Sequence, residues 1–178
     1  MNKPTLLLIA GMPLDPALWA HQTTYLHEIA DIVHADNCGA DSIAELARRA
    51  LAAAPDRFAL AGLSMGGYIA MEIMRQAPER VAKLALLNTN ARSDTPEQTA
   101  NRGQAIELAR QGKMKAVVAA SINRLIHPDR LNDRELVDAV YAQAERVGVD
   151  GYVNQQNAII GRVDSRESLR AVRCPTLV

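Results

Sequence analysis

The chain has 178 residues, of which 48% are hydrophobic and 22% charged, which predicts one globular domain with an apolar core rather than a disordered chain. Its 20 Lys and Arg balance its 20 Asp and Glu, and aromatic residues make up 3%, which argues against nucleic-acid binding. The apolar run Leu6 to Ala10 is too short for a signal peptide or a membrane span, so we expect a cytoplasmic protein with no membrane partner.

Short apolar runs alternate with helical patterns along the first 90 residues. The expected strands are Thr5–Ala10, Asp31–Asp36, Arg57–Gly62 and Lys83–Asn88, and the expected helices are Pro16–Glu28, Ser42–Ala54 and Met65–Gln76, the last closed by Pro78. Ser42 and Glu45 have the spacing of a capping box at the start of the second helix. This alternation favours βαβ units and a mostly parallel, doubly wound sheet of the α/β class.

Beyond residue 88 the pattern is helical until "PTLV" (Pro175–Val178) begins another strand. The first expected helix runs from Thr95 to Gln111, and Gln98 completes a capping box at its start. A second runs from Lys113 to Ile126, and a third, capped by Asn132 with Glu135, runs to Val147. Weaker helices are expected at Asp150–Ile160 and Ser165–Val172. A helical insertion of this size between two strands is typical of a cap over the sheet. We therefore predict a single domain over 1–178, with a core of 1–92 and 171–178 and a helical cap insertion at 93–170. The alternative is that these helices pack as an ordinary layer.

Cys38 and Cys174 lie far apart in the sequence and lack C-x-x-C spacing. Free thiols are the expected state, with a disulfide as the alternative. No two His or Cys residues have metal-ligand spacing, so no metal site is predicted.

The segment Gly62-Leu63-Ser64-Met65-Gly66 matches G-x-S-x-G, the pattern of a nucleophile elbow. An apolar strand precedes it and a helical pattern follows it, which is the context that this motif requires. Ser64 is therefore predicted to be a catalytic nucleophile at the tip of a strained turn at the carboxyl end of the sheet. A dinucleotide fingerprint and a P-loop do not fit these residues, whereas a tight turn with an incidental serine stays open as an alternative.

A serine nucleophile needs backbone donors for the oxyanion that forms on the substrate. The Met65 N–H follows the nucleophile at a helix N-terminus and is the first expected donor. The second should come from the loop after the first strand, Gly11-Met12-Pro13. Proline has no N–H, so this loop points to Met12.

Four segments together resemble the α/β-hydrolase superfamily, in particular its capped serine esterases and lactonases. They are "LLLIAGMPLDPALW", "LAGLSMGGYIAM", "RVAKLALLNTNAR" and "LRAVRCPTLV". The resemblance implies hydrolysis of a small carboxylic ester or lactone through an acyl-enzyme on Ser64, without a cofactor. Hydrolysis of C–C bonds and acyl transfer stay open. Gly11, Leu14, Trp19 and Tyr68 are the expected substrate-pocket residues, and Ala10 departs from the His that relatives commonly carry there.

In this superfamily a catalytic Asp and then a His follow a strand like "PTLV", and neither occurs before Val178. A shortened form, a fragment and an incomplete relative all explain this, so the C-terminal part of the fold is expected to be missing. The histidines His21, His27, His34 and His127 and the carboxylate of Asp94 are not expected to replace the missing pair.

The full-length form is therefore expected to be a hydrolase and the 178-residue chain to be inactive. The alternative is a catalytically silent protein of the same fold that binds a ligand or a partner. An apolar edge strand at "PTLV" would also favour self-association.

Overall fold

Five parallel strands form the central sheet of the computed structural model, which describes residues 3–178. They are β1 (Thr5–Ile9), β2 (Asp31–His34), β3 (Phe58–Leu63), β4 (Val81–Leu87) and β5 (Thr176–Leu177), in the spatial order β2-β1-β3-β4-β5. All four pairings are parallel, and the central one aligns Leu8 with Ala61. The predicted parallel sheet is confirmed, and β1 and β3 lie side by side at its centre.

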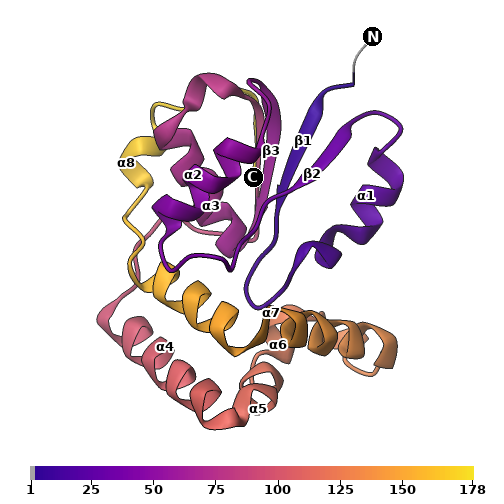
Figure 1. Cartoon of the computed structure of the whole chain (residues 1–178), viewed down its shortest axis with the longest axis vertical. Coiled ribbons are helices and arrows are strands. Elements are labelled where there is room, and N and C mark those ends of the chain that lie inside the picture. Colours follow the sequence, from indigo (N-terminus) through magenta and orange to yellow (C-terminus); the bar gives the residue numbers. More distant parts are fainter. Residues whose placement is uncertain (1–2) are drawn as a thin grey trace.

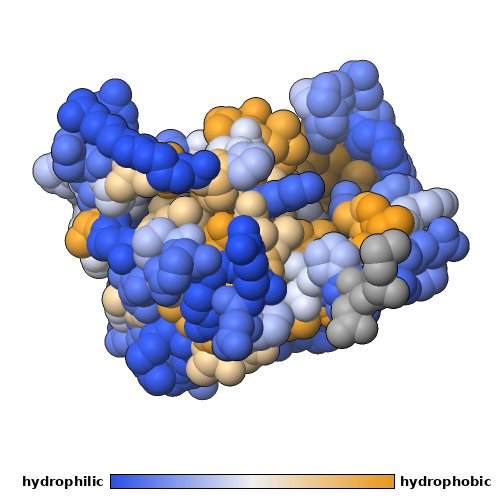
Figure 2. Space-filling view, turned by 90° about the horizontal axis from the view of Figure 1, so that it is seen from above, coloured by the Kyte–Doolittle hydropathy of each residue, from blue (hydrophilic) through white to orange (hydrophobic). Residues whose placement is uncertain are grey.

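Side chains alternate between the two faces of this sheet, and helices cover both (Figure 1). Leu7 and Ile9 pack toward α2 (Ile43–Ala53) and α3 (Met65–Gln76). On the other face Leu8 packs in a cluster with Trp19, the last residue of the 3₁₀ helix η1 (Pro16–Trp19), which leads into α1 (Ala20–Leu26). Viewed from above, hydrophilic residues lie along the outer sides and apolar residues lie between them (Figure 2). This is the distribution expected where helices cover both faces of a sheet.

The predicted capping box at the start of α2 is wrong. Ser42 precedes the helix but makes no side-chain capping hydrogen bond. Glu45 instead accepts hydrogen bonds from Arg48 and Arg49, one turn further along the same helix. Two guanidinium groups are stronger partners for a carboxylate than a backbone N–H, so they draw Glu45 away from the cap.

A helical insertion connects β4 to β5. The short 3₁₀ turn η2 (Pro78–Arg80) precedes β4 and lies outside the insertion. In chain order the insertion contains α4 (Pro96–Leu108), the π-helical turn η3 (Ala109–Lys113), α5 (Met114–Ala119), α6 (Ile122–Leu125), η4 (Pro128–Arg130), α7 (Arg134–Ile160) and α8 (Arg166–Leu169). The predicted capping box at Thr95 and Gln98 is confirmed, with both of its hydrogen bonds present.

One predicted cap and one predicted helix within the insertion are wrong. The helix α7 is capped by Asp133, whose carboxylate accepts from the Leu136 N–H, and not by Asn132. Gly148 interrupts α7 with a non-helical backbone, φ +69° and ψ 177°, which agrees with the predicted helix end at Val147 and with a second helical segment from Asp150. Glycine adopts this backbone conformation readily, so the chain changes direction here between the two helical segments. The helix predicted from Lys113 to Ile126 is instead divided into α5 and α6.

The helices α4 to α7 gather at the carboxyl ends of the strands (Figure 1). Leu14, in the loop after β1, packs into a cluster with Val118 and Val140 of the insertion, and Arg146 of α7 pairs with Asp15 at 2.6 Å. No helix among residues 3–178 is long and apolar enough to cross a membrane. The strand β5 lies at one edge of the sheet with Leu177 exposed, and self-association through it stays a prediction.

Candidate active site

Ser64 occupies the turn between β3 and α3 in a backbone conformation that non-glycine residues rarely adopt. Its φ is +54° and its ψ is −114°, so the predicted strained turn is confirmed. The end of β4 holds this turn from one side. The Ser64 N–H donates to the carbonyl oxygen of Leu87 at 2.9 Å, and the Thr89 hydroxyl donates to the Ser64 carbonyl oxygen at 2.8 Å.

Both glycines of the motif are required by close backbone approach. A Cβ on Gly62 would overlap the backbone of Gly66, and a Cβ on Gly66 would overlap the carbonyl group of Ile9. The strand, the turn and the helix can therefore close on one another only where these side chains are absent. This contact also places the start of α3 directly against the end of β1.

The loop after β1 reaches the same turn. A Cβ on Gly11 would stand 3.1 Å from both the Ser64 Cβ and the Leu63 carbonyl oxygen. Next to it, the Met12 N–H has no acceptor among residues 3–178, and neither has the Met65 N–H at the start of α3. Two unused backbone donors thus flank Ser64, as an oxyanion hole requires.

Asn37, which the sequence analysis missed, holds this loop in place. The residue is 2% exposed, and its side-chain amide donates to the carbonyl oxygens of Ala10 at 3.1 Å, Gly11 at 3.4 Å and Leu14 at 3.0 Å. Because these carbonyls flank Met12, the Asn37 amide fixes the loop from which the Met12 N–H projects. The only signal for Asn37 in the sequence is that a polar residue follows soon after a strand, and many surface residues share this feature.

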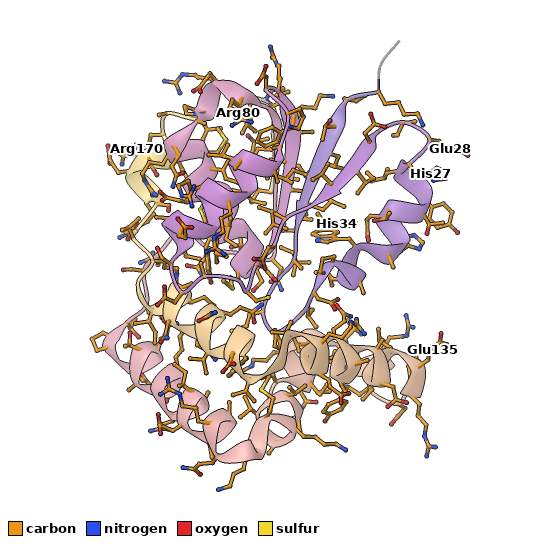
Figure 3. The ribbon with its side chains drawn as sticks, in the orientation of Figure 1. His27, Glu28, His34, Arg80, Glu135 and Arg170 are labelled. Atoms are coloured by element: carbon orange, nitrogen blue, oxygen red, sulfur yellow. The ribbon has the colours of Figure 1, made fainter. Side chains whose placement is uncertain are left out.

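The four histidines are engaged elsewhere. His34 on β2 lies against α1, where its Nε2 is 3.2 Å from the Thr23 hydroxyl (Figure 3). His27 lies at the outer end of α1 (Figure 3). The ring of His21 lies with its centroid 4.5 Å from that of Tyr25 on the same helix, tilted by 45°. His127 is exposed beside Asp129. Among residues 3–178 the Ser64 hydroxyl has no hydrogen-bond partner, so none of these imidazoles acts on it in this structure.

Asp94 is committed to a buried ionic cluster. Its carboxylate is 2% exposed and pairs with Arg102 at 2.6 Å and with Arg162 at 2.5 Å. Burial opposes ionisation, but the hydrogen bonds from the two guanidinium groups outweigh it and lower the pKa of Asp94. The Arg162 guanidinium also lies 4.3 Å from the ring centroid of Tyr68 on α3. Asp94 therefore ties the insertion to the elbow helix, with both carboxylate oxygens occupied.

The remaining predicted pocket residues have different surroundings. Leu14 is buried against the insertion, while Trp19 packs on the sheet with Leu8 and Ala61. Tyr68 lines a cavity of about 70 Å³ that also borders Arg162. A larger cavity, of about 310 Å³, lies between Asp15, the segment 34–38 and Arg146, and Ser64 lines neither. Within residues 3–178 no group of His, Cys, Asp and Glu side chains could hold a metal ion.

Both cysteines are free, as predicted. The Cys38 thiol donates to an Asp36 carboxylate oxygen at 3.4 Å. Burial, followed by the negative charge of Asp36, raises the pKa of Cys38 to about 11. The thiol is therefore protonated near neutral pH and is a poor nucleophile.

Comparison with known proteins places this geometry in context. The family described as "Thioesterase domain" matches residues 26–175. A thermophilic esterase from Thermogutta terrifontis superposes with a TM-score of 0.88 and is 26% identical, over 98% of this chain and 71% of that one. The parallel sheet, the elbow and the helical insertion are thus those of the α/β-hydrolase fold.

Two curated relatives also match. RutD of Azorhizobium caulinodans, named "Putative carbamate hydrolase", is 30% identical over 97% of this chain and 71% of its own length. The pimeloyl-[acyl-carrier protein] methyl ester esterase of Nitrosomonas europaea is 29% identical over 94 residues, which are 48% of this chain. That match covers 37% of the esterase, so this chain corresponds to little more than a third of that relative.

Proposed function

The chain belongs to the α/β-hydrolase superfamily, within its thioesterase-domain family, and we propose that it is the nucleophile-bearing part of a serine hydrolase that cleaves small carboxylic esters or lactones. Ser64 is the proposed nucleophile, and the N–H groups of Met12 and Met65 are the proposed oxyanion donors. The general base and the acid that orients it are proposed to be a His and an Asp outside residues 1–178, as the order of catalytic residues in this superfamily implies.

One observation carries the proposal. Ser64 is held with φ at +54° between two backbone N–H groups that have no acceptor among residues 3–178. Strain of this kind costs about 1–3 kcal/mol and persists where the surrounding structure imposes it, which is common at active sites. Unused donors beside a serine have an obvious partner in the oxygen of a bound carbonyl group.

The proposed reaction has two halves. The Ser64 hydroxyl oxygen attacks the carbonyl carbon while its proton passes to the His, and the carbonyl electrons become an oxyanion held by Met12 and Met65. Collapse of this intermediate expels the alcohol, which takes the proton from the His, and leaves the acyl group on Ser64. Water then attacks the acyl-enzyme by the same route, which releases the acid and restores the serine.

The substrate class rests on chemistry and on the relatives' names. One relative is named for a methyl ester and another for a carbamate, and both bonds join a carbonyl carbon to a leaving heteroatom. The same serine and oxyanion donors would serve each of them. No cofactor takes part in this chemistry.

Covalent labelling tests the proposal. The protein expressed from its complete reading frame should react with a fluorophosphonate probe, and mass spectrometry should locate one adduct on Ser64. Ser64→Ala should abolish the adduct, while Ser42→Ala, at the unused cap position, should leave it unchanged. Labelling that persists in Ser64→Ala would place the nucleophile elsewhere. A wild-type protein that folds but is neither labelled nor active on esters would favour the silent binding protein.

A further inference from the structure

Thr89, which follows the end of β4, contacts the elbow in two ways. Its hydroxyl donates to the carbonyl oxygen of Ser64 at 2.8 Å. Its side chain also fills the space beside Gly67, where an added Cβ would lie 2.5 Å from the Thr89 Oγ1 and 2.6 Å from its Cβ and Cγ2. Gly67 lies just outside the G-x-S-x-G motif, and the need to accommodate Thr89 explains why it is also a glycine.

The backbone at Asn88 brings Thr89 back to the elbow. Asn88 has a φ of +43°, and it and Ser64 are the non-glycine residues with a positive φ among residues 3–178. Asparagine adopts this region more readily than most residues do. Both neighbours of Asn88 bind Ser64, because the Leu87 carbonyl oxygen accepts from the Ser64 N–H and the Thr89 hydroxyl donates to the Ser64 carbonyl oxygen. The turn after β4 therefore holds the peptide groups on both sides of Ser64.

The Ser64 carbonyl and the Met65 N–H belong to one peptide group. That group is planar and trans, so its carbonyl oxygen and its N–H point in opposite directions. The carbonyl oxygen accepts from the Gly67 N–H at 2.9 Å and from the Thr89 hydroxyl at 2.8 Å. These two bonds therefore also set the direction of the Met65 N–H, which points away from Thr89 and has no acceptor among residues 3–178.

The other proposed oxyanion donor is held in the same way. The Met12 N–H shares a peptide group with the Gly11 carbonyl, which accepts from the Leu14 N–H at 2.9 Å and from the Asn37 amide at 3.4 Å. In both peptide groups the carbonyl is bound by the N–H three residues further along and by one side chain. Asn37 follows β2 and Thr89 follows β4, the strands that flank β1 and β3 in the sheet. Each donor is thus supported from the strand next to its own.

We propose that Thr89 is a positioning residue, whose hydroxyl holds the Ser64–Met65 peptide group so that the Met65 N–H is directed at the oxyanion. The inference rests on the proposed function, because it acts through the donor proposed there. A preorganised donor stabilises the transition state only when it is directed at the position that the oxyanion occupies. Without the Thr89 hydroxyl, one hydrogen bond from Gly67 would remain to hold this peptide group, and the Met65 N–H could rotate out of line.

Kinetics of the protein from its complete reading frame test this role. Thr89→Val has nearly the same shape and keeps the packing on Gly67, but it lacks the donor. It should lower kcat for para-nitrophenyl acetate about 10- to 100-fold, less than the loss of a whole donor, while KM changes less than about threefold. Thr89→Ser keeps the hydroxyl and should recover most of kcat. A normal kcat in Thr89→Val would overturn the proposal.

Thr24→Val is the matched control. The Thr24 hydroxyl donates to the Ala20 carbonyl oxygen at 2.9 Å on α1, so this variant removes a hydrogen bond of the same kind away from the elbow. It should leave kcat and KM unchanged. A fall in kcat equal to that of Thr89→Val would show a general effect of losing such a bond, and would also overturn the proposal.

A tetrahedral inhibitor separates positioning from an effect on stability alone. When trifluoromethyl pentyl ketone binds, the Ser64 oxygen adds to its carbonyl carbon, the serine proton passes to the proposed His, and the carbonyl oxygen becomes an oxyanion. Thr89→Val should raise Ki by about the same factor as it lowers kcat. A lower Tm with unchanged kcat and Ki would mean that Thr89 only stabilises the turn, which contradicts the proposal. If Thr89→Val does not fold, Thr89→Ala replaces it, again compared with Thr89→Ser.

Nuclear magnetic resonance tests the orientation of the donor without turnover. Ser64→Ala keeps the backbone carbonyl that Thr89 binds, so adding Thr89→Val should shift the amide proton resonance of Met65, whereas adding Thr24→Val should not. An unchanged Met65 resonance would overturn the proposal. If Ser64→Ala kept full esterase activity, the proposed nucleophile would be wrong and this role with it. If Ser64→Ala is inactive while Thr89→Val has a normal kcat and Ki, only the role of Thr89 is wrong.

Discussion

Gly66 faces the carbonyl group of Ile9 so closely that even a methyl group at position 66 would overlap it. The first turn of α3 therefore rests directly on the end of β1, and the elbow and the loop after β1 are parts of one packed unit.

This contact predicts that Gly66→Ala is severely damaging. The added methyl group must displace backbone on both sides, so we expect loss of several kcal/mol or of soluble protein, together with loss of labelling at Ser64. Gly103→Ala is the control, because a Cβ there meets nothing within 4 Å and the residue lies inside α4. That variant should be more stable by about 0.5–1 kcal/mol in chemical denaturation. Equal stability of the two variants would refute the close approach.

Met12 should matter through its backbone and much less through its side chain. Met12→Leu keeps the N–H and a similar volume, so turnover of an ester substrate should change little. Met12→Pro removes the N–H and should reduce kcat about 10²-fold or more. Measuring kcat and KM for both variants checks this, with circular dichroism to confirm folding. Similar losses in the two variants would mean that the side chain, and not the donor, is needed.

Asn37 should affect the same stabilisation of the oxyanion indirectly, by holding the loop that carries Met12. Asn37→Leu leaves the carbonyl oxygens of Ala10 and Leu14 without their buried donor, which should cost about 1–3 kcal/mol of stability and lower kcat more than it raises KM. Asn37→Asp should also fail, because an ionised carboxylate has the right size but no hydrogen to donate. A variant with normal kcat would show that the loop holds its position without Asn37.

The ionic cluster at Asp94 predicts a pH-dependent loss of stability. Asp94→Asn would leave Arg102 and Arg162 without a buried counter-charge, at a cost of about 3–5 kcal/mol near neutral pH. The folded-state pKa of Asp94 lies below its ordinary value of 3.8, so the carboxylate stabilises the fold above that pH and loses its effect as the pH falls through the folded pKa.

Urea denaturation of wild type and Asp94→Asn from pH 7 to pH 3 measures this difference. The two free energies of unfolding should converge only at the acid end of the range. Convergence already at pH 6 would show that ionised Asp94 is not what stabilises the cluster. Asp164→Asn is a suitable control, because the Asp164–Arg166 pair is largely exposed and should contribute little.

Cys38 should react slowly with alkylating reagents. With a pKa of about 11, only about one thiol in a thousand is ionised at pH 8, so iodoacetamide should modify it far more slowly than a free cysteine. A Cys174→Ser variant isolates the signal, and mass spectrometry gives the rate at each pH. The rate should keep rising up to about pH 11, whereas a plateau near pH 8 would contradict the influence of burial and Asp36.

Much of the fold and the centre of the candidate site could be predicted from the sequence, because their causes are local. Continuous apolar runs separated by amphipathic segments specify a parallel sheet with covered faces, and these patterns lie within ten residues of one another. Gly62 and Gly66 likewise indicate the elbow from local sequence, because the turn around Ser64 admits no side chain at either position. Thr95 and Gln98 likewise cap α4 by contact within one turn.

The parts that could not be predicted depend on partners distant in the sequence. Asn37 is one polar residue among many until the fold buries it against Ala10 and Leu14, and Asp94 finds Arg162 only when the insertion closes on the elbow helix. The capping box predicted from Ser42 and Glu45 does not form, because the arginines beside Glu45 offer its carboxylate stronger partners.

The buried, unpaired amide of Gln155 in α7 is the clearest case. Helical spacing alone makes it an ordinary helix residue beside the similar Gln156, and only tertiary packing decides that Gln156 has partners and Gln155 has none among residues 3–178. Local pattern thus determined which elements form and where the elbow serine, the proposed nucleophile, lies. Burial between distant segments determined which polar groups support the site, because the strength of a hydrogen bond or an ion pair depends on how completely water is excluded from it.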